Sequence, residues 1–169
     1  MKMTLYNLVA AKAETHKNKT AILGFNHVIF NYDHLYQQVT HIGQQLHQLG
    51  LCRYSRIALV LPNGVEAAIA FISVTSHMIC APLNPNYSQH EFGFYLTDLR
   101  ADALVVMEDS QSSAIAVANK HHIPIFYLSR FANDTSQLLG LTTSWRETQP
   151  LEYTSPEPHD IALLLHTSG

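Results

Sequence analysis

The sequence has few charged residues, no basic cluster and no long apolar run, and each shortage excludes a class of protein. Charged residues make up 14% of the 169 residues, with ten Lys and Arg against thirteen Asp and Glu. Without a basic run there is no electrostatic footprint for nucleic acid or for an anionic membrane. No apolar stretch approaches the length that spans a bilayer. We therefore expect neither a nucleic-acid partner nor a transmembrane segment.

Cysteine is also scarce, since Cys52 and Cys80 are the two in the chain. They have no metal-binding spacing, and the N-terminus has the pattern of an amphipathic helix where a secretory signal would have an unbroken apolar segment. We therefore expect two reduced thiols and a cytoplasmic protein. The eleven histidines are scattered without cysteine or carboxylate partners at ligand spacing, so we expect polar surface residues and predict no metal site.

Apolar residues make up 47% of the chain, which is enough for a sizeable core. A helical pattern opens the chain at Leu5, and two short strands are expected between Thr20 and Phe30. Apolar steps of three and four residues then predict an amphipathic helix that begins at Asn31 and ends at Gly50. The opening fifty residues are thus predicted to form two helices separated by a pair of strands.

The middle of the chain repeats a strand followed by a helix. Capping boxes introduce two of the helices, Asn63 with Glu66 and Ser88 with Glu91, and Ser110 is the expected cap of a third. Alternating strands and helices of this length imply right-handed crossovers. We therefore predict an α/β fold, a parallel sheet with helices on both faces, in one unit of residues 1–169. The expected strands cover residues 56–61, 79–81, 103–106 and 123–128.

The last forty residues change character. Residues 130–159 are rich in Thr, Ser, Asn and Pro and are predicted to form a long irregular connection. An apolar strand begins at Ile161 and runs into Thr167, Ser168 and Gly169. Small hydroxylated residues and glycine after a buried strand let backbone N–H groups approach a phosphate. These three residues are the candidate cofactor-binding site, and an ordinary turn is the alternative.

Three segments, in order along the chain, carry a resemblance. Residues 30–35 are similar to the motif Thr-Tyr-x-Glu-Leu, and residues 78–87 to Gly-Ala-x-x-x-Pro-Leu-Asn-Pro with Cys80 as a departure. Residues 160–169 resemble the approach to the signature Thr-Ser-Gly-Thr-Thr-Gly-x-Pro-Lys-Gly, with His166 where an aromatic residue is common. The chain thus resembles the N-terminal third of the adenylate-forming superfamily of acyl-CoA synthetases, peptide-synthetase adenylation domains and luciferases.

The resemblance implies a reaction. Members of the superfamily join a carboxylic acid to the α-phosphate of ATP, with Mg²⁺ as counterion, and a thiol such as coenzyme A then displaces AMP. Thr167 and Ser168 would hold the β- and γ-phosphates. The acyl pocket and the catalytic lysines lie later in such proteins, so no residue here is assigned as catalytic. We expect this chain to be an N-terminal partial subdomain that is inactive alone and binds none of these cofactors alone.

The resemblance leaves open which group of the superfamily the chain comes from, and therefore which thiol accepts the acyl group. Asn84 stands where peptide-synthetase domains usually carry Asp, which favours an acyl-CoA synthetase that acts on a small carboxylic acid. One alternative is an adenylation domain of a peptide synthetase, whose pyrophosphate exchange would respond to amino acids alone. The other is a stand-alone, non-catalytic α/β interaction module. The sequence contains no acyl pocket and no oligomerisation signal, so neither the acid nor the oligomeric state is predicted.

Overall fold

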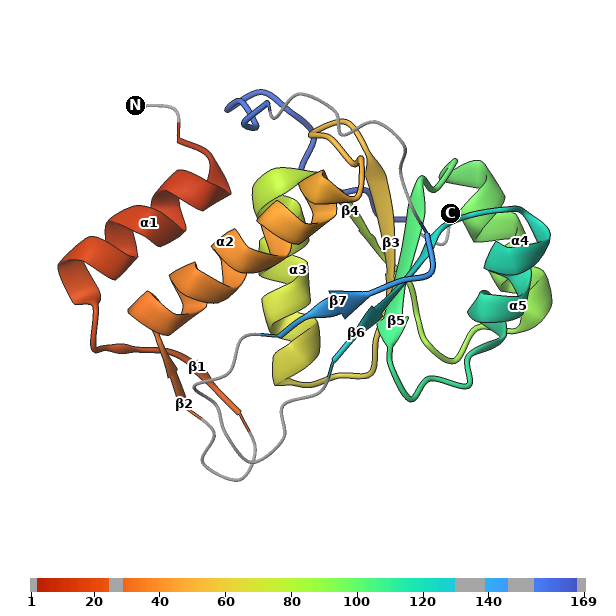
Figure 1. The fold of residues 1–169 in the computed structure, drawn as a ribbon, viewed down its shortest axis with the longest axis horizontal. Coiled ribbons are helices and arrows are strands. Elements are labelled where there is room, and N and C mark those ends of the chain that lie inside the picture. The colour runs from red at the N-terminus through yellow and green to blue at the C-terminus, as the bar shows by residue number, and fades with distance from the viewer. Residues whose placement is uncertain (1–2, 25–28, 130–138, 146–153, 167–169) are drawn as a thin grey trace.

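Helices cover both faces of a central sheet, and a separate strand pair lies at one end (Figure 1). The computed structural model describes residues 3–24, 29–129, 139–145 and 154–166. The helices are α1 (Leu5–His16), α2 (Tyr32–Gln48), α3 (Val65–His77), α4 (Gln89–Asp98) and α5 (Ser113–Lys120). The strands are β1 (Thr20–Leu23), β2 (Ile29–Asn31), β3 (Arg56–Val60), β4 (Ile79–Pro82), β5 (Ala103–Met107), β6 (Ile125–Leu128) and β7 (Leu141–Thr142).

Within these ranges the main sheet has five strands in the order β4-β3-β5-β6-β7. Strands β3 to β6 are parallel, because each is joined to the next by a helix that returns the chain to the starting edge. This arrangement confirms the predicted α/β fold with helices on both faces. The strands β1 and β2 pair antiparallel in a sheet of their own, as the sequence predicted between Thr20 and Phe30.

Strand β7 differs from the prediction, because it lies within the segment expected to be irregular and runs antiparallel to β6. Two glutamines of α2 hold it in place. The side-chain oxygen of Gln38 accepts a 2.9 Å hydrogen bond from the backbone of Leu139, and that of Gln45 accepts a 3.0 Å bond from Leu141. A strand of two residues is too short to show an alternating pattern, so these long-range contacts had no sequence signal.

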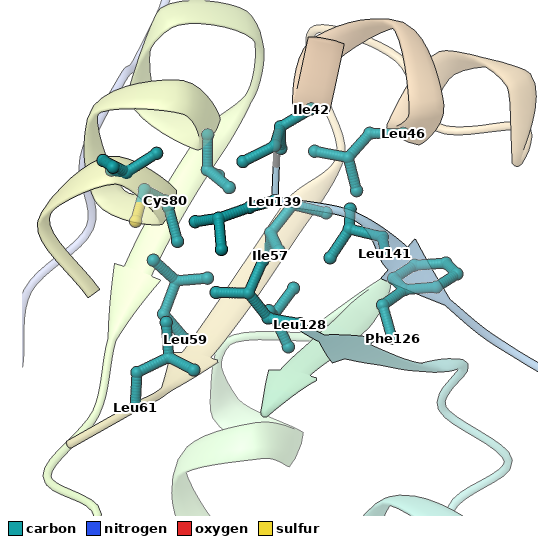
Figure 2. Packing of buried hydrophobic residues seen from close by; sticks show 14 of the residues in the cluster. Ile42, Leu46, Ile57, Leu59, Leu61, Cys80, Phe126, Leu128, Leu139 and Leu141 are labelled. Atoms are coloured by element: carbon teal, nitrogen blue, oxygen red, sulfur yellow. The ribbon is translucent and has the colours of Figure 1, made fainter. Parts of the chain in front are cut away.

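Two apolar clusters lie on opposite faces of the sheet, and the alternation of side chains along β3 divides them. Ile57 and Leu59 point into the larger cluster beneath α1, α2 and α3, where Leu46 of α2 faces Phe126 and its neighbours (Figure 2). Ala58 and Val60 point into the smaller cluster beneath α4 and α5. A parallel strand covered on both faces is expected to be apolar throughout, as β3 is.

The predicted helix starts at Asn31 and Ser88 are confirmed. The side chain of Asn31 accepts a 2.8 Å hydrogen bond from His34 N–H, and Ser88 with Glu91 forms the predicted capping box. Gly50 ends the second helix with φ of 85°, a left-handed conformation that glycine adopts without strain.

Two predicted caps were wrong. The third helix has Gly64 at its N-cap, one residue after Asn63, so Glu66 falls at the second helical position and the expected capping box cannot close. The fifth helix is capped by Ser112, whose hydroxyl accepts from Ala114 N–H, whereas Ser110 accepts from Ser112 N–H one step earlier. The two N-caps therefore lie one and two residues later than predicted.

The prediction of surface histidines is also wrong at two positions. His77 is 3% exposed and His47 is 8% exposed, with ring centroids 5.9 Å apart between α2 and α3. His77 Nε2–H donates to the Val39 carbonyl at 3.1 Å, and the ring also lies 5.1 Å from that of Tyr6. Gly43 makes this packing possible, since a Cβ there would lie 2.3 Å from His77 Nε2.

We expect Gly43→Ala to destabilise the fold by about 2 kcal/mol, because a buried ring fixed by a hydrogen bond cannot move aside. The matched control is Gly93→Ala in α4, where an added Cβ meets no atom within 4 Å. That change should stabilise by about 0.5–1 kcal/mol, the usual gain of alanine over glycine in a helix. Urea unfolding followed by circular dichroism measures both, and equal effects of the two substitutions would contradict the packing argument.

The same burial makes stability depend on pH. Burial is the main cause that lowers the pKa of His77 from 6.5 to about 4, and the neighbouring His47, whose pKa is lowered too, adds to it. Between these values the unfolded chain binds more protons than the folded one, so stability is complete above pH 6.5 and falls as the pH drops toward 4. The other groups that face the ring, Tyr6 and the carbonyl of Val39, carry no charge in this range.

We expect the free energy of unfolding to fall by about 3 kcal/mol across that window. In His77→Gln, which keeps a side-chain donor for the Val39 carbonyl, the slope should be smaller because His47 alone remains buried. The control His90→Gln alters an exposed histidine and should leave the slope unchanged. Urea titrations at intervals from pH 7.5 to 4 test this, and an unchanged slope in His77→Gln would refute it.

Candidate functional site

Arg53 holds the chain segment that leads toward the predicted phosphate-binding residues. Its Nη1 lies 2.7 Å from Glu157 Oε1, 3.4 Å from Asp160 Oδ2 and 3.3 Å from the Ser155 carbonyl. The hydrogen bond to Glu157 is the main cause that raises the pKa of Arg53. A side chain just before β3 thus fixes residues that follow it by about a hundred positions.

The next attachment is to β4. Leu163 forms an isolated parallel bridge with Cys80. Cys80 N–H donates to the Ala162 carbonyl at 2.9 Å, and Leu164 N–H donates to the Cys80 carbonyl at 2.9 Å. Among the described residues from Ile161 onward, this bridge is the only β pairing with the sheet. The strand is therefore shorter than predicted and lies at the outer edge of the sheet.

Burial along this edge is one-sided. Leu164 packs against the smaller apolar cluster, whereas Ile161, Leu163 and Leu165 are 57%, 39% and 63% exposed. The sequence predicted a buried strand from its continuous apolar run, but the structure covers one face of it. The covered face is the one that meets α4.

His166 makes the third attachment, on α4. Its Nε2 lies 2.9 Å from Asp98 Oδ2, and its ring stands edge-on to Tyr95 with centroids 4.7 Å apart. Tyr95 in turn stacks on Tyr87 at 4.8 Å, with 19° between the ring planes. A hydrogen bond between these two tyrosines is the main cause that raises the pKa of Tyr87. No local pattern in the sequence predicts this group, because Asp98 and His166 are 68 residues apart.

The three predicted site residues, Thr167, Ser168 and Gly169, follow His166 directly and lie outside the described residues. The structure therefore places the segment that precedes them, at Arg53, Cys80 and α4, but does not test their role. Thr, Ser and Gly offer hydroxyl and backbone donors, a set that suits phosphate oxygens.

Two surface clefts lie near the residues singled out from the sequence. One, of about 870 Å³, is at the carboxyl ends of β3 and β4 and is lined by residues 61–64 and 82–86. Asn84 Oδ1 accepts a hydrogen bond from Asn86 N–H at 2.9 Å there and so forms an Asx turn. The other, of about 820 Å³, lies between α4 and α5 and includes Tyr95, the residue that contacts His166. The carboxyl ends of parallel strands are where open α/β sheets commonly bind ligands.

Other chemistry is poorly supported by the described residues. Burial raises the pKa of the Cys80 thiol to about 12, so it is not a nucleophile at neutral pH. Across the described ranges, no three His, Cys, Asp or Glu side chains come together as metal ligands. The helices of these same ranges include none with the length and apolar character needed to cross a bilayer.

Comparison with known proteins identifies the fold and the family. The structure superposes on a long-chain-fatty-acid–CoA ligase of Archaeoglobus fulgidus with a TM-score of 0.77, at 20% identity, over all of this chain and 35% of that one. A probable CoA ligase of Humulus lupulus is 28% identical over 171 residues, 99% of this chain and 32% of the relative. An oxalate–CoA ligase of Arabidopsis thaliana is 32% identical over 114 residues, 67% of this chain and 22% of the relative.

This chain thus spans about a third of the length of the first of these relatives. The resemblance noted in three short motifs extends well beyond them, because the family model for AMP-binding enzymes matches residues 9–169. With its α/β fold and a family match that runs from residue 9 to residue 169, the chain belongs to the AMP-binding enzyme family.

Proposed function

We propose that the protein to which this chain belongs is an AMP-forming carboxylate–CoA ligase. It joins a carboxylate to ATP, which gives an acyl-adenylate and pyrophosphate, and then transfers the acyl group to the thiol of coenzyme A with release of AMP. The observation that carries this proposal is the family match over residues 9–169, which includes the three residues that resemble the start of the phosphate-loop signature. The relatives named above are themselves CoA ligases, which supports coenzyme A as the acceptor.

In this reaction the chain contributes phosphate binding. The attack of a carboxylate oxygen on the α-phosphate develops negative charge on the departing pyrophosphate. Fixed N–H and O–H donors stabilise such charge without reorganising during the reaction. The hydroxyls of Thr167 and Ser168, with the backbone N–H groups around Gly169, are the donors that this chain offers. Mg²⁺ bound to the nucleotide would neutralise further charge.

We further propose that residues 1–169 have no ligase activity by themselves. Within the described residues the buried ionisable groups, His47, His77 and Cys80, have structural surroundings and do not converge on a common cleft. Ligase activity of this chain alone would contradict this proposal, whereas tight, saturable binding of a small ligand without activity would favour the stand-alone interaction module. Cytoplasmic location and a small carboxylic acid as substrate belong to the same proposal.

Pyrophosphate exchange by the complete gene product tests the proposal. The protein is incubated with ATP, Mg²⁺ and labelled pyrophosphate, and dicarboxylic, aromatic, medium-chain, long-chain and amino acids are supplied in turn. Exchange that depends on a carboxylic acid, followed by thioester formation when coenzyme A is added, supports the ligase. Exchange with amino acids alone, and no thioester with coenzyme A, would show a peptide-synthetase adenylation domain.

We expect Thr167→Ala and Ser168→Ala each to lower kcat/KM for ATP by about 10- to 100-fold, because each removes one donor from the developing charge. The matched control is Thr154→Ala, an exposed hydroxyl in the same C-terminal segment, which should leave kcat/KM unchanged. Exchange kinetics at varied ATP measure all three variants. Wild-type kinetics in both loop variants would show that the predicted residues do not contact the phosphates.

A further inference from the structure

The residue that precedes the predicted phosphate-binding loop is fixed by two independent contacts. His166 Nε2 is 2.9 Å from Asp98 Oδ2, and the His166 ring lies 4.7 Å from that of Tyr95, one helical turn earlier on α4. The His166 side chain is 24% exposed, whereas that of Asp98 is 58% exposed. A ring that is hydrogen-bonded to a carboxylate and also makes an edge-to-face contact with an aromatic neighbour has little rotational freedom.

The position of Asp98 makes a cationic partner useful. Asp98 is the last residue of α4, and none of the last-turn residues of this fully described helix is basic. The carbonyl ends of a helix carry partial negative charge, so a carboxylate there is unfavourable unless a cation lies beside it. An N–H donor at His166 Nε2, 2.9 Å from Asp98 Oδ2, offsets part of the charge of that carboxylate. The contact therefore benefits the helix and the chain segment together.

The aromatic residues behind His166 make α4 a firm support. Tyr95 stacks on Tyr87 at 4.8 Å, and Tyr87 stands edge-on to the fully buried Phe92 at 5.8 Å. The other end of the helix is closed by the capping box of Ser88 and Glu91. Because α4 is capped at one end and packed through its aromatic rings, its own position is fixed, and so is that of a side chain that packs on it.

We propose that His166 is a positioning residue for nucleotide binding, which holds the segment that precedes Thr167 against α4 through Asp98 and Tyr95. The inference rests on the proposed function, since it assigns nucleotide phosphates to the residues that follow. An aromatic residue at this position would keep the ring contact with Tyr95 and lose the charged one. Arg53 and Cys80 fix the segment further upstream, so His166 is the last described attachment before the loop.

The experiment compares His166→Phe, Asp98→Asn and the double variant in the complete gene product. His166→Phe retains a ring for Tyr95 and isolates the ion pair. Pyrophosphate exchange gives kcat and the KM values for ATP and for the acid. We expect each single variant to raise the KM for ATP about threefold, the size of effect that the loss of a partly exposed hydrogen bond produces, with the KM for the acid unchanged. The double variant should rise no further, because both changes break one contact.

The control is Asp33→Asn, which breaks the 3.6 Å ion pair with Lys17 in the α1–α2 region and should leave both KM values unchanged. Thermal unfolding of every variant separates positioning from general loss of structure. An unchanged KM for ATP in His166→Phe, or equal rises for ATP and acid, overturns this inference and leaves the proposed function intact. If the unchanged protein shows no acid-dependent exchange, the proposed function fails and the inference fails with it.

Discussion

The covering of β3 on both faces is the constraint on which the rest of the structure depends. Its side chains alternate, so Ile57 and Leu59 enter one apolar cluster while Ala58 and Val60 enter the other. The strand also pairs with β4 on one side and β5 on the other, which satisfies its backbone groups. The placement of α2 and α3 on one face and of α4 and α5 on the other follows from the need to bury both rows.

This constraint also decides where long-range polar contacts are possible. The C-terminal segment contacts the protein core more than a hundred residues after Arg53. Apolar contacts are not directional, so apolar contacts alone would fix its position less closely than hydrogen bonds do. Arg53, immediately before β3, binds Glu157 and Asp160 beside the amino end of that strand. Cys80 in β4 then provides the backbone pairing. The guanidinium of Arg53 and the backbone of Cys80 thus lie at fixed positions beside the core, and the C-terminal segment binds first one and then the other along its length.

How much of this could be predicted from the sequence differed with the range of the interaction. The apolar run of β3 and the caps at Asn31 and Ser88 are local signals, and the elements they predicted are present. The two wrong helix starts came from polar residues that lie near a helix end without capping it.

The larger misses all involve distant partners. Strand β7 depends on glutamines of α2, and the burial of His77 depends on the absent side chain of Gly43. The His166–Asp98 pair joins residues 68 apart. A short window of sequence contains at most one partner of such a contact, so its periodicity cannot predict the pair. The family resemblance at residues 160–169 identified the segment, but it did not predict that His166 attaches it to α4.

The alternation of side chains along residues 161–166 explains why a histidine is accommodated at position 166. Leu163 and Leu165 point away from the sheet and are exposed, whereas Leu164 packs against the smaller cluster. Alternation then brings residue 166 to the same face as Leu164, against α4. An apolar or aromatic side chain would satisfy that position by burial alone. Because α4 ends in a carboxylate, a residue with both a ring and a chargeable nitrogen meets Tyr95 and Asp98 together. The departure from the aromatic pattern is therefore matched by the helix on which it lies.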